Sequence, residues 1–136
     1  MKEQTSGTAN TSVVRTERGW AGHIIAHCAN KCRFRRNTLL AYGEIKIVVS
    51  SVGLMENVRE DRNTSFDTIE YNKYYETMAF HADENDKRYF NANTNKTVTF
   101  DREWSISEID AEDKANEMHE SVVAKITERL IKGDKF

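Results

Sequence analysis

LLAYGEIKIVVSSV, residues 39–52, decides the fold class. Leu39–Tyr42 and Ile45–Val49 predict two strands that turn at Gly43, and the segment after the glycine is dense in β-branched residues. Strands joined by so short a turn run antiparallel. The stretch therefore predicts a β-hairpin near the middle of the chain.

Further strands are predicted downstream of this hairpin. IEYNKYYETMAFHA (residues 69–82) alternates like a strand, with Tyr71, Tyr75, Thr77 and Ala79 on one face and Tyr74, Met78 and Phe80 on the other. DEND (83–86) predicts a turn, a short strand follows around Arg88–Ala92, and NTNK (93–96) predicts a second turn into TVTFDREW. These three segments predict an antiparallel meander.

Upstream of the hairpin, two histidines alternate with apolar residues. His23 and His27 fall on one face of a predicted strand and Cys28 on the other. Residues 57–65 (NVREDRNTS) are charged and polar, and they predict an exposed loop.

The C-terminal part changes from strand to helix periodicity. Ser105 and Glu108 fit a capping box, and Gly133 predicts the end of the helix. The apolar positions recur at three and four residues: Ala115, Met118, Val122, Ile126 and Leu130. A polar break at residues 110–113 leaves open a division into a short and a long helix. The predicted class is α+β, an antiparallel sheet followed by a C-terminal helix or helices packed on one face.

Length and composition favour one domain. The chain has 136 residues, 38% of them apolar and 31% charged, which predicts a polar tail at residues 1–12 and a single domain at 13–136. No apolar run reaches 18 residues and the N-terminus lacks a signal-peptide core, so a cytoplasmic location is expected. In that compartment the two cysteines are expected to be free thiols.

The net charge of −2 is unevenly distributed. Seven basic residues face two acidic ones between Val14 and Lys46, whereas residues 101–136 carry ten acidic and six basic residues. Such a local basic segment suits a small anionic ligand better than a polynucleotide, which needs a wider basic surface. A solvated basic face that complements an acidic helix explains the pattern equally well.

A metal site is the sharpest alternative. His23, His27, Cys28 and Cys32 offer four zinc ligands within ten residues. The spacing is not a usual zinc pattern, and strand geometry directs Cys28 away from the histidines. Structural thiols and half-buried histidines are favoured, and no bound metal is expected.

Catalytic signals are weaker still. Cys28 and His27 are adjacent on a strand and cannot pair, and GxSxG, P-loop and HExxH motifs are missing. His119 lies one residue off the helical stripe and is expected at the surface. The sequence predicts neither an enzyme nor a cofactor.

Nucleotide binding fits the residue types that are left. Arg33 and Arg35 share a face of an extended segment beside Arg36, and guanidinium groups grip phosphates and stack on bases. Asn91 and Asn93 fall on one strand face and can contact a base edge. Flat rings come from Trp20, Phe34, Tyr74, Tyr75, Phe80, Tyr89 and Phe90. The alternative is that the rings pack the sheet and the arginines only solubilise it.

RGWAGHIIAHCANKCRFRRNTLLAYGEIKIVVSSVG together with YYETMAFHA resembles the phage Thoeris anti-defence type-one family. The resemblance covers residues 18–104. It implies a sheet followed by helices, symmetric oligomers in the host cell cytoplasm, and sequestration of cyclic ADP-ribose isomers, with cyclic oligonucleotides at a separate site in some members. The candidate ligand-binding residues are Trp20, Arg33, Arg35, Arg36, Phe80, Phe90, Asn91, Asn93 and Arg102.

A sequestering protein needs preorganised contacts and must leave its ligand intact, which agrees with the missing catalytic motifs. Val123 and Ile131 fall off the helical stripe and are expected to serve a partner chain in a homodimer or higher symmetric oligomer. Two other functions stay open. One is a protein–protein inhibitor of phage origin that acts through a sheet edge or the acidic helix, and the other is a small zinc-dependent nucleic-acid module.

Overall fold

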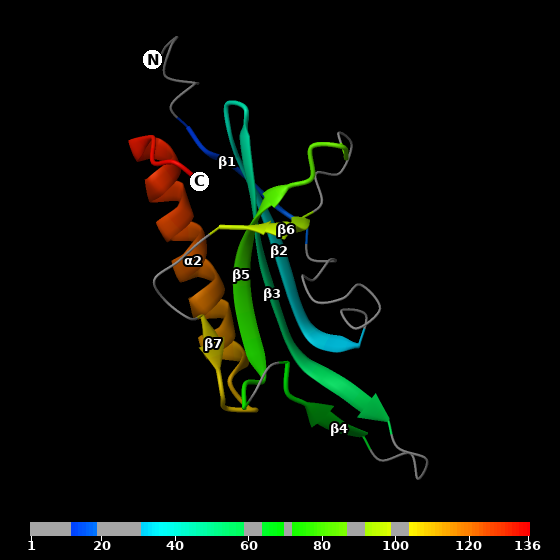
Figure 1. The fold of residues 1–136 in the computed structure, drawn as a ribbon. Helices are drawn as coiled ribbons and strands as arrows, with labels where there is room; N and C mark the ends of the chain where they lie inside the picture. The colour runs from blue at the N-terminus through cyan, green and yellow to red at the C-terminus, as the bar shows by residue number, and fades with distance from the viewer. Residues whose placement is uncertain (1–11, 19–30, 59–63, 70–71, 87–91, 99–103) are drawn as a thin grey trace.

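A computed structural model describes residues 12–18, 31–58, 64–69, 72–86, 92–98 and 104–136. An antiparallel sheet is followed by the C-terminal helix α2 (Glu112–Lys132), which packs against one face of the sheet (Figure 1). The predicted α+β class is confirmed. The strands are β1 (Val14–Glu17), β2 (Cys32–Tyr42), β3 (Ile45–Val58), β4 (Thr64–Asp67), β5 (Tyr75–Ala82), β6 (Ala92–Thr97) and β7 (Ser105–Ile106).

The sheet runs in the order β1-β2-β3-β5-β6, with β4 paired to β3 and β7 paired to β5. The central hairpin is the predicted one: Leu40 lies opposite Ile47, and the turn passes through Gly43, whose φ of 61° suits glycine. The predicted turn at residues 83–86 is also confirmed, because the Asn85 N–H donates to Asp83 Oδ1 at 3.0 Å.

Helix α2 covers the face of the sheet that carries Leu40, Ile47 and Ala79. Its predicted apolar stripe is confirmed, except that Met118 is only half-buried. The stripe is wider than predicted. Val123 is 4% exposed and belongs to this same core, so the expectation that it serves a partner chain is wrong, whereas Ile131 is 54% exposed.

A second apolar cluster lies under the first turn of α2. Phe34 and Tyr75 meet edge to face at 5.6 Å between ring centroids, and Ala111 and Ala115 cover them. Gly53 makes room for this contact. A Cβ atom at Gly53 would lie 2.7 Å from Tyr75 Cδ1.

The ends of α2 differ in how well they were predicted. The capping box is wrong: Ser105 lies in β7, and the helix begins at Glu112 after Ala111, which makes no side-chain cap. The helix runs unbroken to Lys132, so the proposed division into two helices is also wrong. At the C-terminal end Gly133 is confirmed as the stop, with φ at 79° and its N–H donating to the Leu130 carbonyl.

Two predicted loops contain strand residues instead. Asn57 pairs with Ser65 and Val58 with Thr64, so the loop predicted over residues 57–65 is wrong at both ends, because an exposed two-stranded ribbon tolerates polar residues. The turn predicted over 93–96 lies within β6, where the Asn95 N–H donates to Asn93 Oδ1 and the pairing with β5 shifts register.

The predicted alternation in β5 is confirmed, with Tyr75, Thr77 and Ala79 on the helix side, but the strand starts at Tyr75 rather than at residue 69. Asn72 has a φ of 60°, which is incompatible with a continuous strand. The predictions for residues 1–11, for the strand around residues 23–28 and for most of the strand at 88–92 lie outside the described residues. No helix in the described part of the chain is long and apolar enough to cross a membrane.

Candidate functional site

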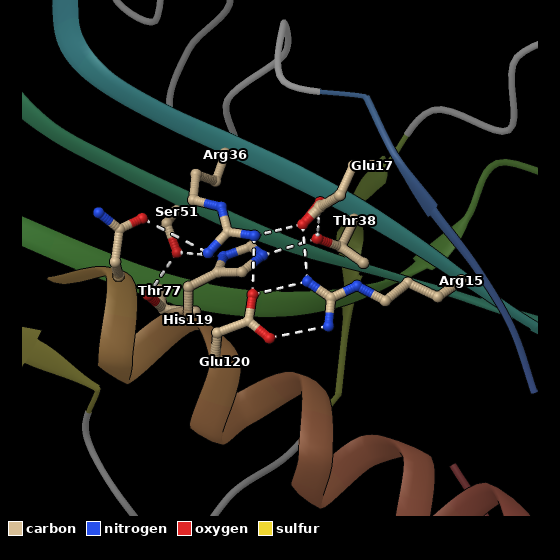
Figure 2. Close-up of polar contacts among 9 residues, drawn as sticks. Arg15, Glu17, Arg36, Thr38, Ser51, Thr77, His119 and Glu120 are labelled. Carbon is tan, nitrogen blue, oxygen red and sulfur yellow. Dashed lines mark hydrogen bonds and ion pairs between the residues drawn. The ribbon is translucent and has the colours of Figure 1, made fainter.

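Four polar side chains meet between the sheet and α2, and we call Thr38, Ser51, Thr77 and His119 the buried polar network (Figure 2). His119 comes from α2, and its Nδ1 lies 2.6 Å from Ser51 Oγ while its Nε2 lies 2.7 Å from Thr38 Oγ1. Ser51 Oγ in turn lies 2.6 Å from Thr77 Oγ1. One side chain of the helix is thus bonded to β2 and β3 and, through Ser51, to β5.

The hydrogen bonds of this network have a defined direction. Thr38 Oγ1 donates its only proton to Glu17 Oε2 at 2.5 Å, so Thr38 can only accept from His119 Nε2–H. His119 Nδ1 is then the acceptor of the Ser51 hydroxyl, and Ser51 accepts from Thr77. The proton of the neutral imidazole is therefore assigned to Nε2.

A charged cluster, Arg15, Glu17, Arg36 and Glu120, covers the network on the side of β1 (Figure 2). Glu120 lies 2.6 Å from Arg15 and 2.8 Å from Arg36. Glu17 lies 2.8 Å from Arg15 and pairs with Arg36 as well. Each carboxylate therefore has two arginine partners, and β1, β2 and α2 are joined by one alternating set of charges.

The charged cluster shifts the pKa values of its members. Hydrogen bonds from Arg15, together with one from Arg36, outweigh the opposing effect of burial and lower the pKa of Glu120 to about 2. Burial alone would raise the pKa of Glu17, but hydrogen bonds from Thr38 and Arg15 and the charge of Arg36 outweigh it and lower that pKa. Burial lowers the pKa of His119 from 6.5 to about 4, and the nearby charge of Arg36 adds to the effect. His119 is neutral at neutral pH.

Serine, histidine and glutamate together have the composition of a hydrolase triad, but this arrangement differs in two ways. Thr38 stands between His119 and Glu17, and both Ser51 and His119 are 0% exposed. A substrate cannot reach Ser51 Oγ in this structure. The hydrogen bonds of the network join α2 to the sheet.

The expectation that His119 lies at the surface is wrong. It follows Ala115 by four residues and precedes Val122 by three, which places it on the buried side of α2. The sequence did contain a pattern that predicts a buried polar residue on α2. Thr38, Ser51 and Thr77 occupy helix-facing positions of three neighbouring strands, and buried hydroxyls require a polar partner on the element that covers them.

The three predicted arginines do not form one group. Arg33 and Arg35 both lie on the face of β2 that points away from α2. Arg36 lies on the opposite face, where it contacts Glu120 of the helix. Arg33 is paired with Glu56 at 2.7 Å and lies over the Phe66 ring at 4.9 Å. Separate partners thus hold Arg33 and Arg36 on opposite sides of the sheet.

Phe80 lies on the same face as Arg33 but far along the sheet. It is level with Leu39, six residues from Arg33 along β2, which is about 20 Å at 3.3 Å per residue. Phe80 is 2% exposed, and it packs as a core residue. A single nucleotide does not span the distance between Phe80 and Arg33. Asn93 lies in β6, and Trp20, Phe90, Asn91 and Arg102 lie outside the described residues.

Of the four proposed zinc ligands, only Cys32 lies within the described residues, where it is a buried free thiol. His23, His27 and Cys28 lie outside that part of the chain. Among the described residues, no cluster of three histidine, cysteine or acidic side chains has the geometry of a metal site.

An open cavity of about 880 Å³ lies at the end of the sheet where the β2–β3 turn, β5 and the C-terminal end of α2 come together. It contains two rings, His81 and Phe136, whose centroids are 6.5 Å apart at an interplanar angle of 85°. Arg129 lies over the Phe136 ring at 4.4 Å and holds it in place. The charged residues of the cavity are Lys46, Lys96, Lys135, Glu44, Asp83, Glu84 and Asp134.

Comparison with known proteins gives no match to a protein-family model, to a curated protein or to a solved structure.

Proposed function

We propose that this protein binds a cyclic nucleotide signal, of the cyclic ADP-ribose isomer class, and sequesters it without cleaving it, so that a Thoeris-type defence is inhibited. The supporting observation is the cavity at the end of the sheet, which combines two rings with three lysines. Its volume of about 880 Å³ falls in the range of small-molecule sites.

The residue types of the cavity suit such a ligand. The His81 and Phe136 rings offer surfaces on which a base can stack, and Arg129 fixes the orientation of Phe136. Lys96 and Lys135 are exposed cations beside these rings, and they attract phosphate groups. The carboxylates of the cavity are acceptors for ribose hydroxyls and base amino groups.

Sequestration requires that the ligand stay intact. The His119 imidazole is enclosed between α2 and the sheet and has both ring nitrogens in hydrogen bonds, so it is not available as a base to a ligand in the cavity. The proposal therefore predicts that bound nucleotide is recovered chemically unchanged.

Calorimetric titration with cyclic ADP-ribose isomers tests the cavity. Lys96→Ala combined with Lys135→Ala should weaken binding about tenfold or more, because each exposed lysine contributes a charge-assisted contact. Lys125→Ala, an exposed lysine of α2 outside the cavity, is the matched control and should bind like the wild type. Unchanged affinity in the folded double variant would remove the cavity from the proposal.

A second pair of variants separates the cavity from the arginines predicted from the sequence. Arg33→Ala and Arg35→Ala lie on the far face of the sheet and should not change the affinity. If these variants lost binding and the lysine double variant did not, the ligand site would lie on that face and not in the cavity. Mass spectrometry of nucleotide released by denaturation completes the test, and recovery of a hydrolysed product would contradict sequestration.

A further inference from the structure

Among the strands of the described residues, β1 lies at one end of the sheet order, and no other described strand pairs with its outer edge. The Arg18 N–H donates to the Asn37 carbonyl of β2 at 2.7 Å. Backbone groups alternate in direction along an antiparallel strand, so Thr16 and Val14 point toward β2 as well. The N–H and C=O groups of Arg15 and Glu17 therefore point outward, where they are available to another strand.

An apolar groove of about 620 Å³ runs beside this edge, between β1 and α2. Val13 and Ile131 line it, Val123, which is 4% exposed, contributes only a small part, and Arg15 and Glu120 also line it. Ile131 is 54% exposed, and Val14 on the opposite face of β1 is 61% exposed. The edge and the groove thus form one continuous surface that combines unpaired backbone with apolar side chains.

We propose that a second copy of this chain docks on this surface, with the two β1 strands antiparallel about a twofold axis at Thr16. A twofold axis perpendicular to the sheet keeps each face continuous, so only residues of the same face lie opposite one another. An axis at Arg15 would oppose two arginines, and an axis at Glu17 would oppose two glutamates. An axis at Thr16 places Arg15 opposite the partner's Glu17, and the reverse, so the four-residue strand is complementary to itself in charge.

The same register uses the outward backbone groups. Arg15 and the partner's Glu17 become a hydrogen-bonded pair, as do Glu17 and the partner's Arg15. The two α2 helices then lie on the same side of a continuous sheet, and the two grooves adjoin across the axis. The apolar side chains of each groove are thereby covered, including Ile131. This interface is independent of nucleotide binding.

Sedimentation velocity over a range of concentrations tests the dimer. Arg15→Ala removes the guanidinium but keeps the outward N–H, whereas Arg15→Pro removes both and leaves the bonds to β2 in place. Arg15→Ala should weaken the dimer and Arg15→Pro should leave only monomer. Ile131→Glu should weaken it about tenfold or more, and Lys125→Glu, on an exposed part of α2 outside the groove, should not.

Hydrogen exchange on the unmodified protein gives a second, position-specific test. The amides of Arg15 and Glu17 should become protected only as the concentration rises, while the amides of Thr16 and Arg18 are protected at all concentrations. A monomer at millimolar concentration would overturn the proposal. So would a dimer that is insensitive to Arg15→Pro and Ile131→Glu, or edge amides whose exchange does not depend on concentration, even if another protein were found on β1.

Discussion

The imidazole of His119 on α2 lies 2.7 Å from the hydroxyl of Thr38 on β2, and apolar clusters flank the buried polar network to which both belong. One core cluster, which includes Leu40 and Ile126, lies on one side of this contact, and the cluster of Phe34 and Tyr75 lies on the other. Moving α2 by one turn would leave the imidazole without partners and place an apolar residue against the strand hydroxyls. The contact therefore selects one position of the helix on the sheet.

Replacement of His119 tests how much this contact stabilises the fold. His119→Ala leaves the Thr38 and Ser51 hydroxyls buried beside a cavity, and the free energy of unfolding should fall by about 2–4 kcal/mol. Urea denaturation followed by circular dichroism measures the loss.

Two further variants separate the hydrogen bonds from general effects on the helix. His119→Gln keeps a donor and an acceptor and should recover part of the loss. Glu117→Ala, an exposed neighbour on α2, should change stability by less than about 0.5 kcal/mol. Equal stability of His119→Ala and the wild type would show that the network contributes nothing to the folded state.

The pH dependence of stability has a defined sign at this residue. The unfolded chain takes up a proton on His119 near pH 6.5, whereas the folded protein resists it down to about pH 4, because burial disfavours the imidazolium. The free energy of unfolding should therefore fall as the pH is lowered from about 6.5 to about 4, by on the order of 3 kcal/mol.

A pH series of urea denaturation curves on the wild type and His119→Gln isolates this effect, since the remaining histidines are common to both. The stability difference between the two proteins should shrink across this pH window. Glu120 acts in a lower window: its folded pKa of about 2 means that its contribution is lost as the pH falls from 4.5 toward 2. A difference that stays constant from pH 7 to pH 4 would contradict the assignment of a buried neutral His119.

The sequence predicts the parts of the fold that depend on local patterns. Three features were predicted correctly: the β-branched strand after residue 45, the turn at Gly43 and the apolar stripe of α2. Each of them is determined by residues that lie close together in the sequence. The N-terminal end of α2 was not, because it is stabilised from a distance by Tyr75, and no local pattern competes with the apparent capping box at Ser105.

The candidate site was harder to predict for the same reason. The arginines of residues 33–36 look like one cluster in the sequence, but the strand period sends Arg36 to the helix side, where Glu17 and Glu120 neutralise it. The cavity at the end of the sheet joins residues 44–46, 81–84, 96 and 133–136. The pairing of β3, β5 and β6 brings the first three of these segments together, and the packing of α2 across the sheet adds residues 133–136. The periodicity of a single segment reports neither the pairing nor the packing.

Two glycines should respond to alanine for different physical reasons. Gly53→Ala places a Cβ atom 2.7 Å from Tyr75 Cδ1, and the resulting overpacking should cost about 1–3 kcal/mol. Gly43 has open space around its Cα but a φ of 61°, so Gly43→Ala should cost about 1 kcal/mol through backbone strain. Gly43→Asn should be tolerated better, because asparagine adopts this conformation readily. Thermal unfolding of the three variants distinguishes the two causes, and a Gly53→Ala variant as stable as Gly43→Asn would contradict the packing at Tyr75.

Tyr75 anchors the residues that lead into α2. Its hydroxyl donates to the Ile109 carbonyl at 2.7 Å and lies 3.4 Å from the Ala111 N–H, and burial raises the pKa of the phenol, so it stays protonated. Tyr75→Phe keeps the edge-to-face contact with Phe34 but removes these bonds, and we expect a loss of about 1–2 kcal/mol. The loss should be accompanied by faster hydrogen exchange in the first turn of α2, while the last turn, which ends at Gly133, is unchanged. Tyr74→Phe, which removes the neighbouring hydroxyl, is the control and should leave that turn protected. Uniform exchange along α2 in Tyr75→Phe would show that the helix start does not depend on this hydroxyl.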